Sequence, residues 1–278
     1  MQENSNDTML ICPLCKKALN KEDNRFVCEN SHNFDCAKQG YVNLLPVQNK
    51  KSKNPGDNKA MISCRKAFME KTYYDFLLAP CVQLIAEYID KSPEKAVLLD
   101  IGCGDGYFTD KLFSLHADTA FTYGMDISKE AVKVAAKRNK NINWFVASSS
   151  DIPLVNNCVD VLLKINAPLD YQHAKNKLNA NGIVISITPG KNHLFELKKT
   201  IYDKPRQHEP ENCPEHYNLL HSVNLQQQLE LKSVEDVQNL FMMTPLFWNA
   251  SKDVQQKVNE LPYLDTCISF DINVWGVA

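Results

Sequence analysis

The stretch AVLLDIGCGDGYF, at Ala96–Phe108, decides the fold of this chain. Its first half is an apolar run with the length of a buried strand, and its second half is a glycine-rich turn that opens a helix over 109–115. Glycine adopts positive φ angles without steric cost, so Gly102, Gly104 and Gly106 allow the backbone to approach a ligand closely. A strand, a glycine turn and a helix in this order predict the nucleoside-binding edge of an α/β sheet.

A second predicted strand, Phe121–Asp126, ends in an acid that can accept hydrogen bonds from both ribose hydroxyls of a nucleoside cofactor. Dinucleotide sites favour G-x-G-x-x-G, whereas the spacing here is G-x-G-x-G behind Asp100. The Asp100 carboxylate would repel a pyrophosphate but can bind a cationic amino-acid tail. A strand-to-helix turn with no ligand would be enough to explain the three glycines, but it would not explain the acid after the second strand. The additional acid at the second strand favours a nucleoside-cofactor site. The segment LDIGCGDG strongly resembles motif I of the class I methyltransferases, and this resemblance implies that the cofactor is S-adenosylmethionine.

The rest of the chain continues this alternation. Further strands are predicted at 142–147, 158–168 and 181–190, the last after a turn at Asn181–Gly182, with Ser148–Asp151 within reach of an adenine. Helical patterns separate the strands, and 60–79 also has helical spacing. The C-terminal run 266–275 alternates apolar and polar residues and predicts a final antiparallel strand. We therefore expect a mostly parallel, Rossmann-like α/β sheet with its ligands at the carboxyl ends of the strands.

The N-terminal segment carries two closely spaced ligand pairs. Cys12 and Cys15 form C-P-L-C, and Cys28 and His32 form C-x3-H. Two such pairs on short turns supply the four ligands of a tetrahedral zinc ion, which would provide most of the folding free energy of so small a segment. Four unrelated buried side chains are the alternative, and the paired spacing argues against it. Cys36 is a competing ligand in principle, but we interpret it as a small apolar residue.

Composition limits the class of protein. The chain has 278 residues, 44% of them hydrophobic and 23% charged, with a formal net charge of −2, as in an ordinary globular protein. We find no secretory signal and no apolar run long enough to span a membrane, and we expect a cytoplasmic protein. From Lys38 to Lys71, however, eight basic residues and two acids give a net charge of +6. This local bias is compatible with contacts to RNA phosphates or with a solvated loop.

Taken together, these motifs resemble one family closely. The segments CPLC, KQGYVNLLPVQ, NPGDNKAM, LDIGCGDGYFT, TPG and NHLFELK are similar to those of the RlmA-type 23S rRNA (guanine-N1)-methyltransferases, over essentially the whole chain. The likeness is strongest to the branch, typical of Gram-negative bacteria, that modifies a guanine in the helix 35 hairpin. It implies a class I S-adenosylmethionine-dependent methyltransferase domain at 61–278, a zinc-binding RNA-recognition module at 1–43 and a basic linker at 44–60.

The resemblance also assigns roles to single residues. It matches the zinc ligands Cys12, Cys15, Cys28 and His32, and it implies cofactor contacts for Gly106, Tyr107, Tyr74 on the preceding helix and His193 after the fifth strand. With the residues argued above, the predicted cofactor set is Tyr74, Asp100, Gly102, Gly104, Gly106, Tyr107, Asp126 and His193. Asn166 departs from the tyrosine of relatives, which puts an aromatic stacking role at that position in doubt. A homodimer is also implied.

Methylation of guanine N1 requires a base, because N1 carries a proton. Asp57 and Asp151 are the carboxylates to test, since each lies in a loop expected to border the cofactor cleft. The target guanine is expected to flip into the pocket, with Phe34, Tyr41 or Tyr107 as stacking surfaces. A methyltransferase acting on another RNA, a protein or a small molecule remains an alternative, as does a non-catalytic zinc-stabilised RNA-binding protein.

Overall fold

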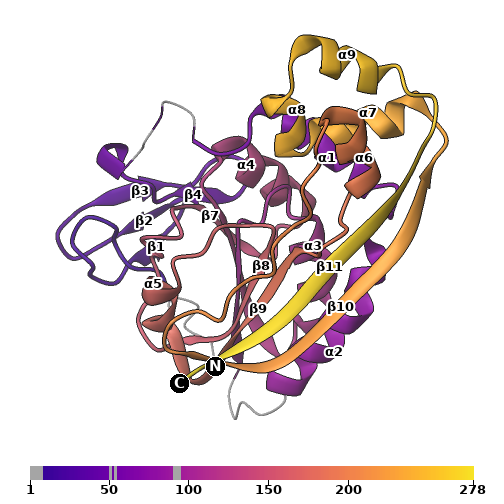
Figure 1. Ribbon diagram of the computed structural model, residues 1–278. Helices are drawn as coiled ribbons and strands as arrows, with labels where there is room; N and C mark the ends of the chain where they lie inside the picture. The colour runs from indigo at the N-terminus through magenta and orange to yellow at the C-terminus, as the bar shows by residue number, and fades with distance from the viewer. Residues whose placement is uncertain (1–8, 50–51, 53–54, 90–94) are drawn as a thin grey trace.

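The computed structural model describes residues 9–49, 52, 55–89 and 95–278, so Lys50, Lys51 and Lys53 of the predicted basic linker lie outside the described residues. An eight-stranded sheet in the order β10-β11-β9-β8-β5-β6-β7-β4 forms the centre (Figure 1). Neighbouring strands from β4 to β9 run parallel, and β10 and β11 are antiparallel, which confirms the predicted α/β class. The strands span Tyr41–Asn43 (β4), Ala96–Ile101 (β5), Ala120–Asp126 (β6), Asn143–Val146 (β7), Val159–Ile165 (β8), Leu178–Pro189 (β9), Tyr217–Leu231 (β10) and Leu264–Val277 (β11).

Two apolar layers cover the two faces of this sheet, because successive side chains of a strand point to opposite sides. In β5, Leu98 packs into one layer and Val97 and Leu99 into the other. None of the helices among the described residues is long and apolar enough to cross a membrane. The helices are α1 Lys59–Met69, α2 Leu78–Ile89, α3 Tyr107–Phe113, α4 Lys129–Arg138, α5 Tyr171–Lys175, α6 Phe195–Ile201, α7 Val234–Met242, α8 Pro245–Asn249 and α9 Lys252–Asn259.

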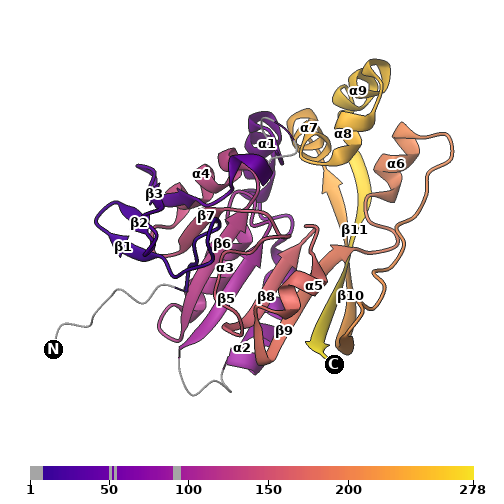
Figure 2. The same ribbon diagram turned by 90° about the vertical axis from the view of Figure 1, so that its left-hand side faces the viewer.

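The N-terminal segment forms its own small antiparallel sheet of β1 (Asn20–Glu22), β2 (Arg25–Val27) and β3 (Asn33–Asp35). It does not stand apart from the large domain. Leu10 bridges to Leu154, and strand β4 adds to the edge of the central sheet beside β7, with Tyr41 opposite Trp144. Figure 2 shows the small sheet next to β7 at this edge. The apolar residues of the small sheet therefore share a core with the strands of the central sheet.

The helix predicted over 60–79 is two helices. Asn58 caps α1 by accepting hydrogen bonds from the backbone N–H groups of Ala60 and Met61. The chain then turns at Thr72, whose φ is 64°, before η2 (Asp75–Leu77) and α2 begin. Tyr74 lies in this break, at the N-terminus of η2.

The C-terminal third departs furthest from the expectation. The final antiparallel strand is confirmed as β11, but β10 and the helices α7, α8 and α9 were not predicted. Strand β10 is an edge strand with most of its residues exposed, so its sequence lacks the alternation of a half-buried strand. The turn predicted at Asn181–Gly182 is an irregularity within β9, where the pairing with β8 skips from Leu178 to Ile183.

Candidate functional site

The two N-terminal ligand pairs converge on one point. The ligand atoms of Cys12, Cys15, Cys28 and His32 all lie within 4.8 Å of one another. His32 Nδ1 lies 3.5 Å from both Cys12 Sγ and Cys28 Sγ, and the sulfurs of Cys15 and Cys28 are 3.6 Å apart. Zinc–ligand bonds of about 2.0–2.3 Å in a tetrahedron produce ligand separations of this size. The donor set therefore fits a structural zinc ion. Within the described part of the chain, this cluster does not include Cys36.

The glycine turn lies at the carboxyl end of β5. Gly102, Gly104 and Gly106 all have positive φ angles, of 70°, 58° and 76°. A Cβ atom on Gly106 would lie 2.8 Å from Ala135 Cβ, so this glycine allows the turn to pack against α4. A Cβ atom on Gly104 would meet only Arg65 within 4 Å. Gly104 is thus the least crowded glycine of the turn, and it faces Arg65 on α1.

The two predicted acids flank this turn. Asp126, at the end of β6, accepts hydrogen bonds from the backbone N–H groups of Gly104 (3.0 Å) and Ser128 (2.7 Å). Asp100 accepts a hydrogen bond of 2.5 Å from the hydroxyl of Thr109. Burial raises the pKa of Asp100 to about 7, against the opposing effect of the Thr109 hydrogen bond. Burial also raises the pKa of Asp126. A cationic ligand placed between these two carboxylates would stabilise their ionised forms.

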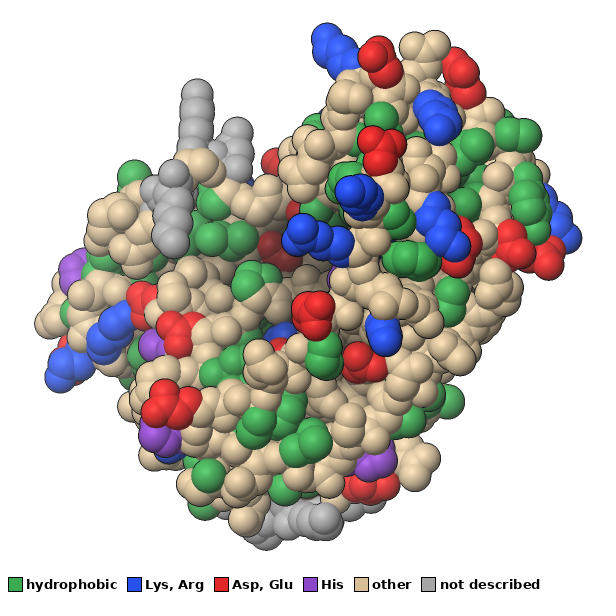
Figure 3. Space-filling model, viewed as in Figure 1, with side chains coloured by type: hydrophobic (Ala, Val, Ile, Leu, Met, Phe, Trp, Pro, Cys, Tyr) green, Lys and Arg blue, Asp and Glu red, His purple; other side chains and the backbone are tan. Residues whose placement is uncertain are grey.

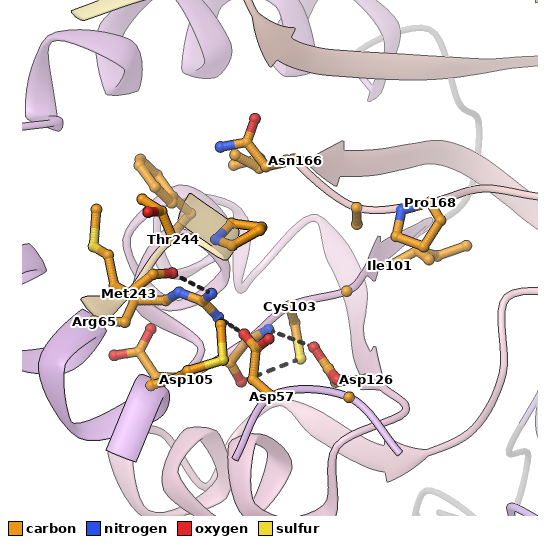
Figure 4. Close-up of a pocket in the computed structure, with 18 of the residues that line it drawn as sticks. Asp57, Arg65, Ile101, Cys103, Asp105, Asp126, Asn166, Pro168, Met243 and Thr244 are labelled. Carbon is orange, nitrogen blue, oxygen red and sulfur yellow. Dashed lines mark hydrogen bonds and ion pairs between the residues drawn. The ribbon is translucent and has the colours of Figure 1, made fainter. Parts of the chain in front are cut away.

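A cavity of about 810 Å³ opens over these groups. Its floor is the end of the parallel strands, and its roof is α1 together with the segment between α7 and α8. Arg65 on α1 bridges the roof, with Nη1 2.5 Å from Asp57 Oδ2 and Nη2 3.3 Å from the backbone oxygen of Met243 (Figure 4). Asp57 in turn is held by Ser128, whose hydroxyl donates to its backbone oxygen over 2.7 Å. One ion pair and two hydrogen bonds therefore enclose the cavity on this side.

Aromatic side chains form the wall next to α6. Tyr74 lies edge-on to Phe270 and to His193, with ring centroids 5.2 Å and 6.2 Å away. The Ser269 backbone donates a hydrogen bond of 3.2 Å to His193 Nδ1. Burial lowers the pKa of His193 to about 3, so the ring is neutral and its proton is on Nε2. His193 is therefore a hydrogen-bond donor and not a base.

Asn166 lies across the cavity from Asp57 and Arg65 (Figure 4). It follows the last residue of β8 and has a φ of 52°, and its backbone N–H donates to Ile187 over 2.9 Å. Asparagine tolerates this left-handed conformation better than most residues. The side chain is exposed to the cavity, so an amide with a donor and an acceptor lines the wall where relatives were expected to carry a tyrosine.

The cavity brings most of the predicted cofactor residues together. Tyr74, Asp100, Gly102, Gly104, Tyr107, Asp126 and His193 all line it, as does the candidate base Asp57. Gly106 lies behind the turn, and Asp151 forms a 2.6 Å ion pair with Lys16 outside the lining. The expectation for Tyr41 is wrong: it is buried beside Trp144 and, unlike the equally buried Tyr107, it does not line the cavity, so it offers no stacking surface.

Several lining residues were not predicted from sequence. Arg65 lies in a helix with no motif. The roof residues Met243–Leu246 lie between α7 and α8 and at the start of α8, two helices that were not predicted. Lys198 and His208 line the cavity from α6 and the segment that follows it. The only sequence signal for Arg65 was its place in the basic stretch from Lys38 to Lys71.

Comparison with known protein families matches both parts of the chain. The family described as RlmA, N-terminal, a zinc ribbon, matches residues 10–53. The family described as Methyltransferase domain matches residues 92–257, which contain the glycine turn and both acids.

The chain is also similar to curated relatives along most of its length. It is 30% identical to "Putative 23S rRNA (guanine-N(1)-)-methyltransferase YxjB" of Bacillus subtilis (strain 168), over 95% of this chain and 96% of the relative. It is 27% identical to the 23S rRNA (guanine(748)-N(1))-methyltransferase of Streptomyces fradiae, over 91% of each chain. A third relative, from Micromonospora griseorubida, is 28% identical over 68% of each chain.

Proposed function

The chain belongs to the 23S rRNA (guanine-N1)-methyltransferase family, and on that premise we propose that it methylates N1 of a guanine in the helix 35 hairpin of 23S ribosomal RNA. It binds S-adenosylmethionine and one structural zinc ion. One observation carries the proposal. A single cavity contains both the glycine turn with Asp126 and the polar side chains of Asp57, Asn166 and His193, and the zinc module packs on the same sheet.

S-adenosylmethionine supplies an already activated methyl group when bound, so the protein has mainly to position it. Asp126 would hold the ribose hydroxyls, because each of its oxygens has one lone pair left beyond the bonds from Gly104 and Ser128. Asp100 and the backbone of Gly102 and Gly104 would hold the cationic tail. Tyr74, Tyr107 and His193 would enclose the cofactor, and Gly106 would support the turn from behind.

Asp57 is the proton acceptor that fits the cavity better. It lines the cavity, and only its Oδ2 is engaged by Arg65, which leaves Oδ1 able to accept. Asp151 remains the second candidate, although its Oδ1 is bound by Lys16. Asn166 and the Nε2–H of His193 could hydrogen-bond the edge of the guanine base, and His193 cannot accept the N1 proton because its Nδ1 is occupied.

The zinc module at 1–43 and the linker at 44–60 would hold the RNA hairpin, and 61–278 would carry the chemistry. Phe34 of β3 is half-buried and remains a candidate stacking surface. A cytoplasmic location and a homodimer complete the proposal, since the substrate is ribosomal and the resemblance implies a dimer.

The test is nucleoside mass spectrometry of unmodified large-subunit rRNA incubated with the purified protein and S-adenosylmethionine, followed by mapping of the modified base. We expect 1-methylguanosine in the helix 35 hairpin. Asp126→Ala should abolish it by weakening cofactor binding, whereas Asp118→Ala, at an exposed acid elsewhere on the surface, should not. Methylation at another position of the rRNA would overturn the helix 35 assignment. The absence of any methylated nucleoside, despite measurable cofactor binding, would overturn the RNA substrate.

A further inference from the structure

A second cavity of about 450 Å³ lies beside the first. It is lined by Lys198 of α6, by residues of the segment 202–208 that follows this helix, and by Leu246 of α8. Lys198, His208 and Leu246 line both cavities. The second cavity is therefore the immediate neighbour of the space that would receive the guanine.

The charge of this second cavity is one-sided. Lys198, Lys204 and Arg206 line it, and no carboxylate does among the described residues. Lys204 and Arg206 are exposed, and neither has an ion pair within the part of the chain that the structure describes. Asp203 and Glu209 flank them in sequence but do not line the cavity. Figure 3 shows the surface hollowed between the zinc module and the C-terminal helices, with Lys and Arg side chains interspersed with Asp and Glu side chains along the border formed by the C-terminal part.

Three hydrogen bonds fix the backbone that presents these cations. Lys198 Nζ donates to the backbone oxygen of Arg206 over 3.1 Å. The backbone N–H of His208 donates to the backbone oxygen of Lys191, also over 3.1 Å. Gln207 Nε2 donates to Asn192 Oδ1 over 2.8 Å. Lys204 and Arg206 therefore project from a segment that is already ordered, which lowers the entropic cost of binding an anion.

We propose that this second cavity binds a backbone phosphate of the RNA next to the target guanine, with Arg206 and Lys204 as its ligands and Lys198 as a positioning residue. The proposal rests on the proposed function. A base that flips into a pocket leaves its own phosphates at the mouth of that pocket. A guanidinium offers paired donors that match phosphate oxygens, and a lysine adds a point charge. An anion site that shares a wall with the base pocket is placed to fix the flipped nucleotide.

The experiment compares the double variant Lys204→Ala/Arg206→Ala with the wild type in binding to a helix 35 RNA fragment at several salt concentrations. The matched control is Lys137→Ala/Lys140→Ala, which removes two exposed cations at the C-terminal end of α4. We expect the double variant to bind RNA about tenfold more weakly, with the slope of log K against log salt reduced by about 0.7–0.9 for each phosphate that the protein no longer neutralises. The control should change neither, and the Kd for S-adenosylmethionine should stay unchanged in both.

A second arm identifies the phosphate. RNA fragments with one neutral methylphosphonate linkage at each position within two nucleotides of the target guanine are bound to both proteins. At one linkage the wild type should lose affinity for the RNA while the double variant does not. The neutral linkage in the RNA and the double substitution in the protein then remove the same interaction. Equal salt slopes for the double variant and the control, or equal losses at every linkage in both proteins, would overturn the phosphate site. Those readouts are independent of catalysis, so 1-methylguanosine formation by the wild type tests the proposed function separately.

Discussion

Arg65 and Asp57 close the cavity from above: the guanidinium Nη1 lies 2.5 Å from the carboxylate Oδ2, and both side chains are partly buried. Through its second amino group Arg65 also reaches the backbone of Met243. One side chain thus connects the loop before α1 with the end of α7, two segments far apart in sequence that meet over the glycine turn.

Variants of this ion pair distinguish two roles for Asp57, a structural contact with Arg65 and the acceptance of the N1 proton. If Asp57 only tethers the roof, Arg65→Met and Asp57→Asn should each weaken cofactor binding by a similar amount, about three- to tenfold, and the double variant should be no worse. If Asp57 also accepts the N1 proton, Asp57→Asn should in addition reduce single-turnover methylation at saturating cofactor by about 10²- to 10⁴-fold, whereas Arg65→Met should not. Asp151→Asn in the same assay tests the second candidate.

Cofactor affinity should depend on pH through Asp100. Burial raises the pKa of this carboxyl to about 7, and a cationic ligand binds the ionised form. Affinity should therefore fall by up to about tenfold per pH unit below about pH 7, and it should fall again at higher pH as the α-amino group of the cofactor, whose ordinary pKa is about 8, loses its proton. Thr109→Val removes the hydrogen bond that lowers this pKa, so the midpoint should move to higher pH. Calorimetric titrations across about pH 5.5–8.5 measure both, with Thr119→Val at an exposed site as control. An unmoved midpoint would contradict the role of Asp100.

Loss of zinc should destabilise the large domain as well as the N-terminal module. Cys12 and Cys28 are buried in the same apolar layer as Val97 and Leu99 of β5. Cys28→Ser should therefore abolish the bound zinc and lower the Tm of the whole chain, because metal binding supplies folding free energy on the order of 10 kcal/mol. Cys36→Ser should keep one equivalent of zinc. Elemental analysis and thermal unfolding followed by circular dichroism are the measurements, and an unaltered Tm without zinc would refute the shared core.

Asn166 should act on the RNA and not on the cofactor. Asn166→Ala removes an amide that lines the cavity, and we expect kcat/KM for RNA to fall about tenfold with the cofactor Kd unchanged. The backbone there has a positive φ, so alanine also introduces strain. Asn166→Gly removes the amide without that strain and should show the same loss of activity. Asn157→Ala, at a second asparagine with positive φ (56°), controls for the strain alone. Equal activity in Asn166→Gly and the wild type would eliminate the role.

The strands around the glycine turn could be predicted because their chemistry is local. A run such as Val97–Ile101 is buried on both faces, and the turn that follows needs glycine for conformational reasons that a single segment reveals. The four zinc ligands could also be predicted, because tetrahedral zinc sites use closely spaced ligand pairs that can be recognised in the sequence.

The roof and the walls of the cavity could not be predicted in this way. Strand β10 is exposed on most of its length, and its order depends on pairing with β11, from which the three helices α7, α8 and α9 separate it in the chain. Arg65 and Lys198 became recognisable only from the segments that tertiary structure brings next to them. For the same reason, Tyr41 could be read as a stacking residue when it is a buried edge-strand residue.

The pairing of β4 with β7 affects the order in which the chain can fold during translation. Tyr41–Asn43 leaves the ribosome well before its partners at 144–146 have been synthesised. The zinc ligands are complete by then, so the small sheet can fold around its metal while the strand behind it still lacks a neighbour. Docking of the module is therefore a late event, and it completes the edge of the central sheet only after the cofactor-binding strands β5 and β6 have emerged.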